Sequence, residues 1–357
     1  MIRPRKHLEP IWRDPQSWGA RGNSLRLDMN ELVPHLDEQV FSELVSSLRP
    51  WMISAYPEVN PAYEALTESS GLSRDHFLLT AGSDAGIRTV IEAFCDPGDA
   101  LVITYPTYGM YEVYAQIYDV RCVKVSYQPD FSLDPADILN ALDERTKVVA
   151  IANPNGAIGC AIPVSDLQRI IEHASGNGTT VLLDEAYIHY YQDHWTQRID
   201  DYDNLVIVRT FSKAGGLAGL RFGYLLSNPA LREWLFKIKP VIELSSVAAI
   251  FGAYLLKHPE VVERAIKATI EGRDYLLARL REVGFETYCG ATNFIQVKFG
   301  PFKQAILEEL SKRKIRVKDQ SSSPLLHEYT RITFGPREEM DLLLDAVFEV
   351  VTVAPKR

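Results

Sequence analysis

The chain has 357 residues, of which 46% are hydrophobic and 24% charged, and its formal net charge is −9. These proportions are typical of a folded, globular protein of about two domains, and they exclude a disordered or low-complexity chain. An acidic chain without a run of basic residues is a poor binder of nucleic acid or of an anionic membrane, so neither is an expected partner.

Short apolar runs alternate with amphipathic helical patterns through the middle of the chain. Four runs rich in Val, Ile and Leu predict strands at Ala100–Thr104, Lys147–Asn153, Thr179–Tyr187 and Leu205–Lys213. Because these runs are apolar on both faces, they indicate a mostly parallel sheet that is covered on both sides. Helical faces follow Ser83 and Ser165, so Ser165 and either Ser83 or Asp84 are expected to be N-caps. This alternation predicts an α/β domain.

The end of the chain has a different pattern. A buried helix is expected at Val247–Leu256, because this apolar run is only about half of the roughly 20 residues that cross a bilayer. The next segments predict a smaller α+β domain, with helix, strand, helix and strand at Arg273–Phe285, Thr292–Phe299, Phe302–Arg313 and Thr330–Gly335. The expected divisions are an N-terminal arm with part of the small domain, a large domain and a small C-terminal domain, at 1–55, 56–250 and 251–357.

Cysteine usage and the start of the chain bear on the compartment. The four cysteines lie far apart and form no CxxC or Cys/His pattern, which argues against a disulfide framework or a zinc site. The basic start, MIRPRKHLEP, lacks the apolar region of a secretory signal. Reduced thiols and no signal are typical of a cytoplasmic protein.

Chemically useful side chains follow the predicted strands. Asp184 and Tyr187 come at the end of the third strand, Lys213 ends the fourth, and Arg221 follows eight residues later. The segment TAGSDAG opens a helix with small residues. Because ligands of α/β sheets bind at the carboxyl ends of strands, we expect these groups to face one crevice.

Together these groups meet the needs of pyridoxal 5′-phosphate. A lysine can form a Schiff base with an aldehyde cofactor, and a buried carboxylate can keep a pyridine nitrogen protonated so that the ring withdraws electrons. The backbone N–H groups of a Gly- and Ser-containing helix start bind phosphate, and an arginine adds a bidentate pair. A tyrosine can lie on the ring or bond through its phenolic oxygen.

At these residues the sequence resembles the fold-type I, PLP-dependent aminotransferases of class I/II, in their histidinol-phosphate aminotransferase-like branch. The resemblance runs from LRLDMNE (Leu25–Glu31) to TRITFGPREE (Thr330–Glu339) and is strongest in VRTFSKAGGLAGLRFGY, with DEAY and PTYGMY ahead of it. It implies a large domain with a mostly parallel sheet between helices and a smaller α+β domain.

The resemblance also implies roles at the cofactor. Lys213 is similar to the lysine that holds the cofactor and moves the α-proton, and Asp184 to the aspartate that pairs with the pyridine nitrogen. Tyr187 resembles the tyrosine that bonds the cofactor 3-oxygen, and Tyr108 the ring that stacks on pyridoxal. The residues that match the phosphate cup are Ser83, Asp84, Thr210, Ser212 and Arg221.

Three further matches concern the substrate and a second subunit. Tyr56, in SAYPE, resembles a tyrosine that reaches the cofactor phosphate of the neighbouring subunit, which implies a homodimer with shared active sites. Arg331 is similar to the arginine that grips the anionic group of the substrate. Asn30 lies in the N-terminal strip that borders the substrate.

The chain departs from the family pattern around the cofactor and the substrate. Where the family has N-P-N-N-P-T-G this chain has NPNGAIG, so Gly156 replaces the asparagine that usually bonds the cofactor 3-oxygen. Asn155, one residue away, substitutes for it if the loop shifts. Gly215 stands where a bulky aromatic residue usually follows SKA, which predicts a wider or looser loop. Lys318 stands where an arginine usually binds a substrate anion, and it keeps the charge without the bidentate fork.

These observations predict a PLP-dependent aminotransferase that moves an amino group between an amino acid, by resemblance glutamate, and a small anionic oxo substrate. The departures keep open the same fold and cofactor used for elimination, cyclisation or decarboxylation of a modified amino acid. A catalytically silent binding or regulatory module is a third hypothesis, against which Lys213, Asp184 and Arg221 argue.

Overall fold

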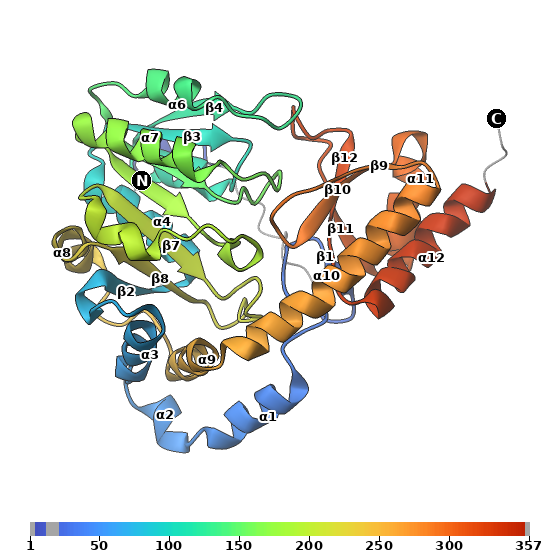
Figure 1. Cartoon of the computed structure of the whole chain (residues 1–357), viewed down its shortest axis with the longest axis horizontal. Helices are drawn as coiled ribbons and strands as arrows, with labels where there is room; N and C mark the ends of the chain where they lie inside the picture. Colours follow the sequence, from blue (N-terminus) through green and yellow to red (C-terminus); the bar gives the residue numbers. More distant parts are fainter. Residues whose placement is uncertain (1–3, 12–20, 354–357) are drawn as a thin grey trace.

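The structure, a computed structural model, describes residues 4–11 and 21–353, so residues 12–20 of the expected N-terminal arm lie outside the described residues. Two sheets form the centres of two domains, and the long helix α10 (Pro259–Glu282) runs from the larger domain into the smaller one (Figure 1). The expected class, α/β with a mostly parallel large sheet, is confirmed.

The large sheet has seven strands in the order β2-β8-β7-β6-β5-β3-β4. Only β8 runs antiparallel to its neighbours, β2 and β7. The strands are β2 (Phe77–Ala81), β3 (Ala100–Tyr105), β4 (Arg121–Ser126), β5 (Thr146–Ala152), β6 (Thr180–Asp184), β7 (Leu205–Thr210) and β8 (Phe222–Ser227). Because crossover connections put helices on both faces, the inner strands are buried on both sides, as their apolar runs predict.

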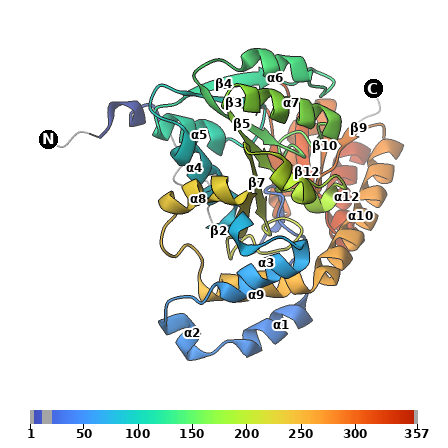
Figure 2. The ribbon, with the colours of Figure 1, turned by 60° about the vertical axis from the view of Figure 1, so that its left-hand side comes forward.

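Two layers of helices cover this sheet, and alternate strand residues face each layer. Leu182 packs with one layer and Val181 and Leu183 with the other. The first layer contains α4 (Gly82–Phe94), α5 (Met110–Ile117) and α8 (Pro229–Ile238). The second contains α3 (Asn60–Ser70), α6 (Pro135–Ala141), α7 (Val164–Gly176) and α9 (Ser246–Lys257). Figure 2 shows α4 and α8 apart from the α3 and α9 pair.

The small domain has a five-stranded sheet in the order β1-β11-β12-β10-β9. Its strands are β1 (Leu25–Leu27), β9 (Glu286–Cys289), β10 (Phe294–Lys298), β11 (Ile315–Asp319) and β12 (Tyr329–Thr333). It packs against α11 (Lys303–Lys312), α12 (Arg337–Val353) and the second half of α10. The N-terminal β1 pairs in parallel with β11, so an early segment of the chain completes this sheet.

Short elements complete the described chain. Helices α1 (Glu38–Ser47) and α2 (Pro50–Ser54) run along the outside of α3 and α9 (Figure 1). The 3₁₀ turns are η1 (Lys6–Leu8), η2 (Arg74–His76), η3 (Ile188–Tyr190), η4 (Thr196–Asp201) and η5 (Gly300–Phe302). None of the helices in these described segments is both long enough and apolar enough to cross a bilayer.

Some expected boundaries were wrong. The helix expected at Arg273–Phe285 is the second half of α10, which begins at Pro259, a residue that suits the first helical turn. The expected N-caps were also wrong, since Ala81 and Pro163 precede α4 and α7. Gly82 has a φ of 74°, so the chain turns there and the serine that follows already lies inside the first turn.

Candidate active site

Asp184 ends β6 as a buried carboxylate, with 5% of its surface exposed. The phenol of Tyr111 donates to its Oδ2 over 2.8 Å, and the backbone N–H of Ala186 donates to its Oδ1 over 3.0 Å. Burial raises the pKa of Asp184 to about 6, although these two bonds and the charge of Lys213 act in the opposite direction. A cationic ring nitrogen near this carboxylate would favour its charged form.

Tyr111 is a partner that sequence reasoning missed. It lies on α5, 73 residues before Asp184, and it is fully buried. Its ring also meets Tyr108 edge to face, with centroids 6.2 Å apart. The motif PTYGMY contains Tyr111, in the first turn of α5 and three residues after Tyr108, but nothing in that segment indicates that it reaches Asp184.

Lys213 follows β7 and points toward Tyr187 and the N-terminal segment. Its Nζ donates to the carbonyl of Met29 over 3.0 Å and lies 5.7 Å from the centre of the Tyr187 ring. The loop beyond it is tight, because a Cβ on Gly215 would lie 2.6 Å from Cδ1 of Phe211. The expectation of a wider loop at Gly215 was therefore wrong: the glycine makes room for an inward-facing Phe211.

A cradle for an anion lies where α4 begins. A Cβ on Gly82 would fall 2.7 Å from Nη2 of Arg221, so this guanidinium lies directly on the helix start. Gly223 of β8 approaches the same glycine, and a Cβ there would lie 2.8 Å from its Cα. Within the described segments Arg221 makes no ion pair, and its Nη1 lies 3.5 Å from the carbonyl of Ala218. Ser83 lies in the first turn of α4.

Two hydroxyls lie at the end of β7. The hydroxyls of Thr210 and Ser212 are 2.8 Å apart, and the backbone N–H of Ser212 donates to the Thr210 oxygen over 3.1 Å. Thr210 also donates to the carbonyl of Phe222, which follows Arg221. These bonds tie the end of β7 to the start of β8 beside the cradle.

Asp84 faces two phenols. Tyr108 donates to its Oδ1 over 3.2 Å and Tyr114 to its Oδ2 over 3.0 Å. Although 44% of Tyr108 is exposed, its partial burial and the charge of Asp84 raise its pKa. These two hydrogen bonds hold the phenol of Tyr108 beside Asp84, which lies in the first turn of α4.

The loop after β5 contains Asn155 and Gly156, and the Asn155 side chain is hydrogen-bonded within the protein. The Asn155 oxygen accepts from the N–H groups of Ala157 and Ile158, over 2.8 and 3.0 Å, and its Nδ2 donates to the carbonyl of Pro106 over 3.1 Å. The side chain is fully buried. Both ends of this amide are bonded to the protein, so Asn155 shapes the loop.

The guanidinium of Arg331 forms no ion pair with an acidic side chain in the part of the chain that the structure describes. Its Nη1 donates to the carbonyl of Gly156 over 2.9 Å and its Nη2 to the carbonyl of Asp28 over 3.1 Å. Its buried Nε has no partner among the described residues, and burial lowers its pKa. Lys318 of β11 is its cross-strand neighbour and is exposed. An anion would complete the unsatisfied donors of Arg331.

The two remaining expected residues differ in their surroundings. Asn30 is buried, and its Nδ2 donates to the Tyr187 phenol over 2.7 Å. Tyr56, by contrast, is 86% exposed just beyond the end of α2 and joins none of these side chains within the subunit.

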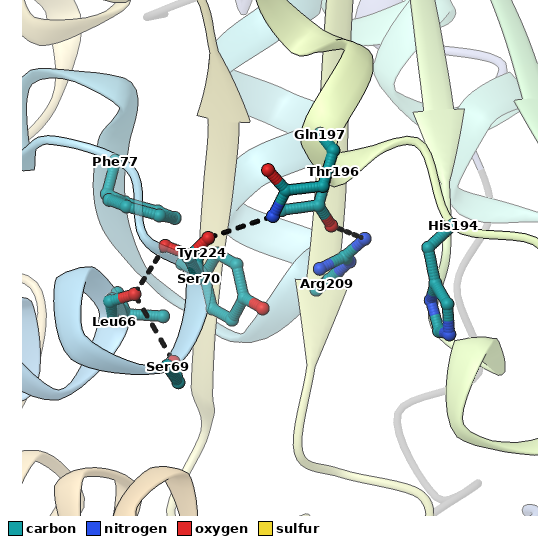
Figure 3. Close-up of a pocket in the computed structure, with 9 residues that line it drawn as sticks. All are labelled: Leu66, Ser69, Ser70, Phe77, His194, Thr196, Gln197, Arg209 and Tyr224. Atoms are coloured by element: carbon teal, nitrogen blue, oxygen red, sulfur yellow. Dashed lines mark hydrogen bonds between the residues drawn. The ribbon is translucent and has the colours of Figure 1, made fainter.

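A cavity of about 280 Å³ lies elsewhere, on the α3 side of the sheet (Figure 3). Arg209, which pairs with the buried Glu185 at 2.6 Å, donates to Thr196 there, and Gln197 reaches the carbonyl of Ser70. None of the strand-end residues described above lines this cavity, so the candidate site lies outside it.

Comparisons with known proteins identify the family of this chain. Residues 55–347 match the family model described as aminotransferase class I and II. The histidinol-phosphate aminotransferase of Thermococcus gammatolerans is 33% identical, covering 91% of this chain and 92% of that protein. The Shigella sonnei enzyme of that name is 35% identical, covering 83% and 84%.

Solved structures give the same result. The histidinol-phosphate aminotransferase of Sinorhizobium meliloti, in complex with pyridoxal 5′-phosphate, superposes with a TM-score of 0.81 at 25% identity, covering 92% of this chain and 91% of that one. The aspartate aminotransferase of Thermus thermophilus, with maleate, shares the fold, with a TM-score of 0.77 at 20% identity and coverage of 92% and 91%. These relatives do not favour an elimination, cyclisation or decarboxylation enzyme.

Proposed function

This chain belongs to the class I and II aminotransferase family and is a PLP-dependent aminotransferase, and we propose that it takes its amino group from glutamate and delivers it to a small oxo compound that carries an anionic group. Arg331 is the observation that carries the substrate part of the proposal. It is a buried cation with an unsatisfied Nε, no acidic partner among the described residues, and a place beside Tyr187 and Gly156.

The residues present fit the cofactor. Arg221 and the N-terminal N–H groups of α4, with Ser83, Thr210 and Ser212, would hold its phosphate. Asp184 would pair with the pyridine nitrogen, Tyr187 would bond the 3-oxygen, and Tyr108 would cover the ring. When bound, the cofactor carries the amino group and withdraws electrons from the substrate α-carbon. In this proposal Asp84 holds the phenol of Tyr108 in place, and Asn155 shapes the loop after β5.

Lys213 has two tasks in this proposal. It would hold the cofactor covalently, and the lysine amine that the substrate amino group displaces from that bond would then move the proton at the substrate α-carbon. Its hydrogen-bond partner is a backbone carbonyl, that of Met29, and it forms no ion pair with a carboxylate of the described residues. Arg331 would orient the α-carboxylate of glutamate so that the α-proton faces this amine.

The oxo substrate would place its anionic group near Arg331 and Lys318. The relatives in T. gammatolerans and S. sonnei are named for histidinol phosphate, which puts ketones of that kind first among the compounds to test. Lys318 supplies a point charge on the strand next to Arg331, in cross-strand register.

We also propose a homodimer in the cytoplasm. Tyr56 would reach the phosphate of the partner's cofactor, as in the family pattern. Support comes from large apolar side chains that are exposed on α1 and α2, just before Tyr56 in the chain, since exposed apolar surface is typical of interfaces. They are Phe41, Val45, Trp51 and Ile53. Cys95, Cys122, Cys160 and Cys289 are free thiols, which fits a reducing compartment.

An absorbance spectrum tests the donor. The purified holoenzyme is recorded before and after addition of L-glutamate without an acceptor. We expect the visible band of the bound cofactor to be replaced by the shorter-wavelength band of its amine form, and oxo acceptors are then screened for its return. A visible band that persists with glutamate but is lost with another amino acid would overturn glutamate as the donor.

A further inference from the structure

Asn30 and Tyr187 come from distant parts of the chain and meet in the site. Asn30 follows β1 of the small sheet, and Tyr187 follows β6 of the large one. The Asn30 Nδ2 donates to the Tyr187 oxygen over 2.7 Å, and Asn30 is only 2% exposed. Asn30 has a φ of 57°, a left-handed conformation that asparagine adopts more readily than most residues.

The orientation of this amide is set at its other end. The backbone N–H of Asn30 donates to the hydroxyl oxygen of Thr333 over 3.1 Å, and that hydroxyl lies 3.2 Å from the Asn30 Oδ1 and donates to it. Asn293 donates to the carbonyl of Asn30 over 3.0 Å. Because the Thr333 proton must face an oxygen, the NH₂ group of Asn30 faces Tyr187.

Because Asn30 presents its NH₂ group to Tyr187, it limits the directions in which the phenol can donate a hydrogen bond. An NH₂ group cannot accept a hydrogen bond, so Tyr187 can only accept from Asn30 and must donate elsewhere. The Nζ of Lys213 lies over the face of the Tyr187 ring, 5.7 Å from its centre. The phenol proton is therefore free to be donated toward whatever Lys213 holds.

We propose that Asn30 is a positioning residue that makes Tyr187 a one-way hydrogen-bond donor to the cofactor 3-oxygen, and so offsets the loss of the family asparagine at Gly156. This inference rests on the proposed function, because it takes the 3-oxygen to lie beside Tyr187. Gly156 supports it: a Cβ there would lie 2.8 Å from the Tyr187 ring, so an asparagine at 156 and Tyr187 in this place exclude one another.

The test is a pH titration of the visible band of the holoenzyme. The 3-oxygen carries most negative charge in the deprotonated chromophore, so a donor to it lowers the pH midpoint. In Asn30→Asp a carboxylate would accept the phenol proton and turn it away from the cofactor, while the left-handed backbone is still tolerated. We expect the midpoint to rise by about one pH unit. Asn30→Gly also suits this backbone and should give a smaller rise, because water can replace the amide.

Two comparisons separate this role from a structural one. Asn293→Ala removes an amide that holds the same backbone without touching Tyr187, and its midpoint should match that of the wild type. In a Tyr187→Phe background, Asn30→Asp should add no further shift, since it acts through the phenol. A midpoint that Asn30→Asp leaves unchanged, or shifts equally without the phenol, overturns the inference. A wild-type protein without any visible band after addition of PLP would instead overturn the cofactor assignment.

Discussion

Gly156 lies so close to Tyr187 that a Cβ on it would fall 2.8 Å from Cε2 of the ring and 3.3 Å from the phenol oxygen. The carbonyl of the same glycine accepts from Arg331 over 2.9 Å. Gly156 therefore contacts both Tyr187, which we propose bonds the cofactor, and Arg331, which we propose binds the substrate. A side chain at 156 must move Tyr187 or the loop.

Gly156→Ala therefore tests this spacing. The added Cβ would displace the Tyr187 phenol from Asn30, and we expect kcat/KM for glutamate to fall about tenfold, the effect of losing one hydrogen bond of roughly 1.4 kcal/mol. Steady-state kinetics measure this. Gly109→Ala is the matched control, because Gly109 has no neighbour within 4 Å and an ordinary helical φ of −63°. Equal rates in both variants would contradict the packing argument.

The burial of Asp184 predicts a pH dependence of stability in the cofactor-free protein. Its pKa is about 6 in the folded state and near the ordinary 3.8 when unfolded. Between these values the folded state binds more protons, so the free energy of unfolding decreases as pH rises from about 4 to about 6. Above that range, burial of the charged carboxylate has lowered the free energy of unfolding by about 3 kcal/mol relative to its value at low pH.

Asp184→Asn removes the buried negative charge and keeps the size and shape of the side chain. We expect the cofactor-free variant to melt above the wild type at pH 8, with a difference that shrinks toward pH 4, and to bind PLP more weakly. Thermal melts of both proteins across this pH range measure the trend. A difference that is constant with pH would contradict the assigned titration.

How far the sequence predicts this structure depends on how local each signal is. The four apolar runs predicted β3, β5, β6 and β7 because both faces of these strands are buried. The strand ends then predicted Asp184 and Lys213. The antiparallel β8 was not predicted, because its residues FGYLLS overlap the motif that contains Arg221.

The partners of the site residues could not be predicted. Tyr111 reaches Asp184 from 73 residues away, and Asn30 reaches Tyr187 from 157 residues away. The first pair is set by the folding of the large domain and the second by the contact between the two domains, and no periodicity within a short window encodes either. The family resemblance implied that Asn30 borders the substrate, but it did not predict the hydrogen bond from Asn30 to Tyr187.

Arg221 should control affinity for the cofactor phosphate. Arg221→Lys keeps the charge but loses the bidentate fork, and we expect the dissociation constant of PLP to rise about tenfold, and about a hundredfold in Arg221→Ala. Titration of the cofactor-free protein, followed by the visible band, measures this. The control is Arg88→Ala, which removes an exposed arginine of α4 that pairs with Glu92 at 3.4 Å. Unchanged affinity in Arg221→Ala would refute the cradle.

Arg331 should determine binding of the amino donor. Arg331→Lys loses the planar fork that a carboxylate matches, so kcat/KM for glutamate is expected to fall about a hundredfold, mainly through KM. Arg316→Lys is the control, because Arg316 lies on the neighbouring strand and contacts Asp28 only at 3.6 Å. A variant with normal KM for glutamate would show that another cation holds the carboxylate.

The exposed Tyr56 gives the sharpest test of a shared site. If each site takes Lys213 from one subunit and Tyr56 from the other, a hybrid of a Lys213→Ala subunit and a Tyr56→Ala subunit has one site with both changes and one with neither. Two nearly inactive proteins, unfolded and refolded together, should then regain up to about a quarter of the wild-type activity, since half of randomly paired dimers are hybrids and half of their sites are intact. Refolding each variant alone is the control. If Tyr56 instead serves its own subunit, every site keeps one change and mixing restores nothing.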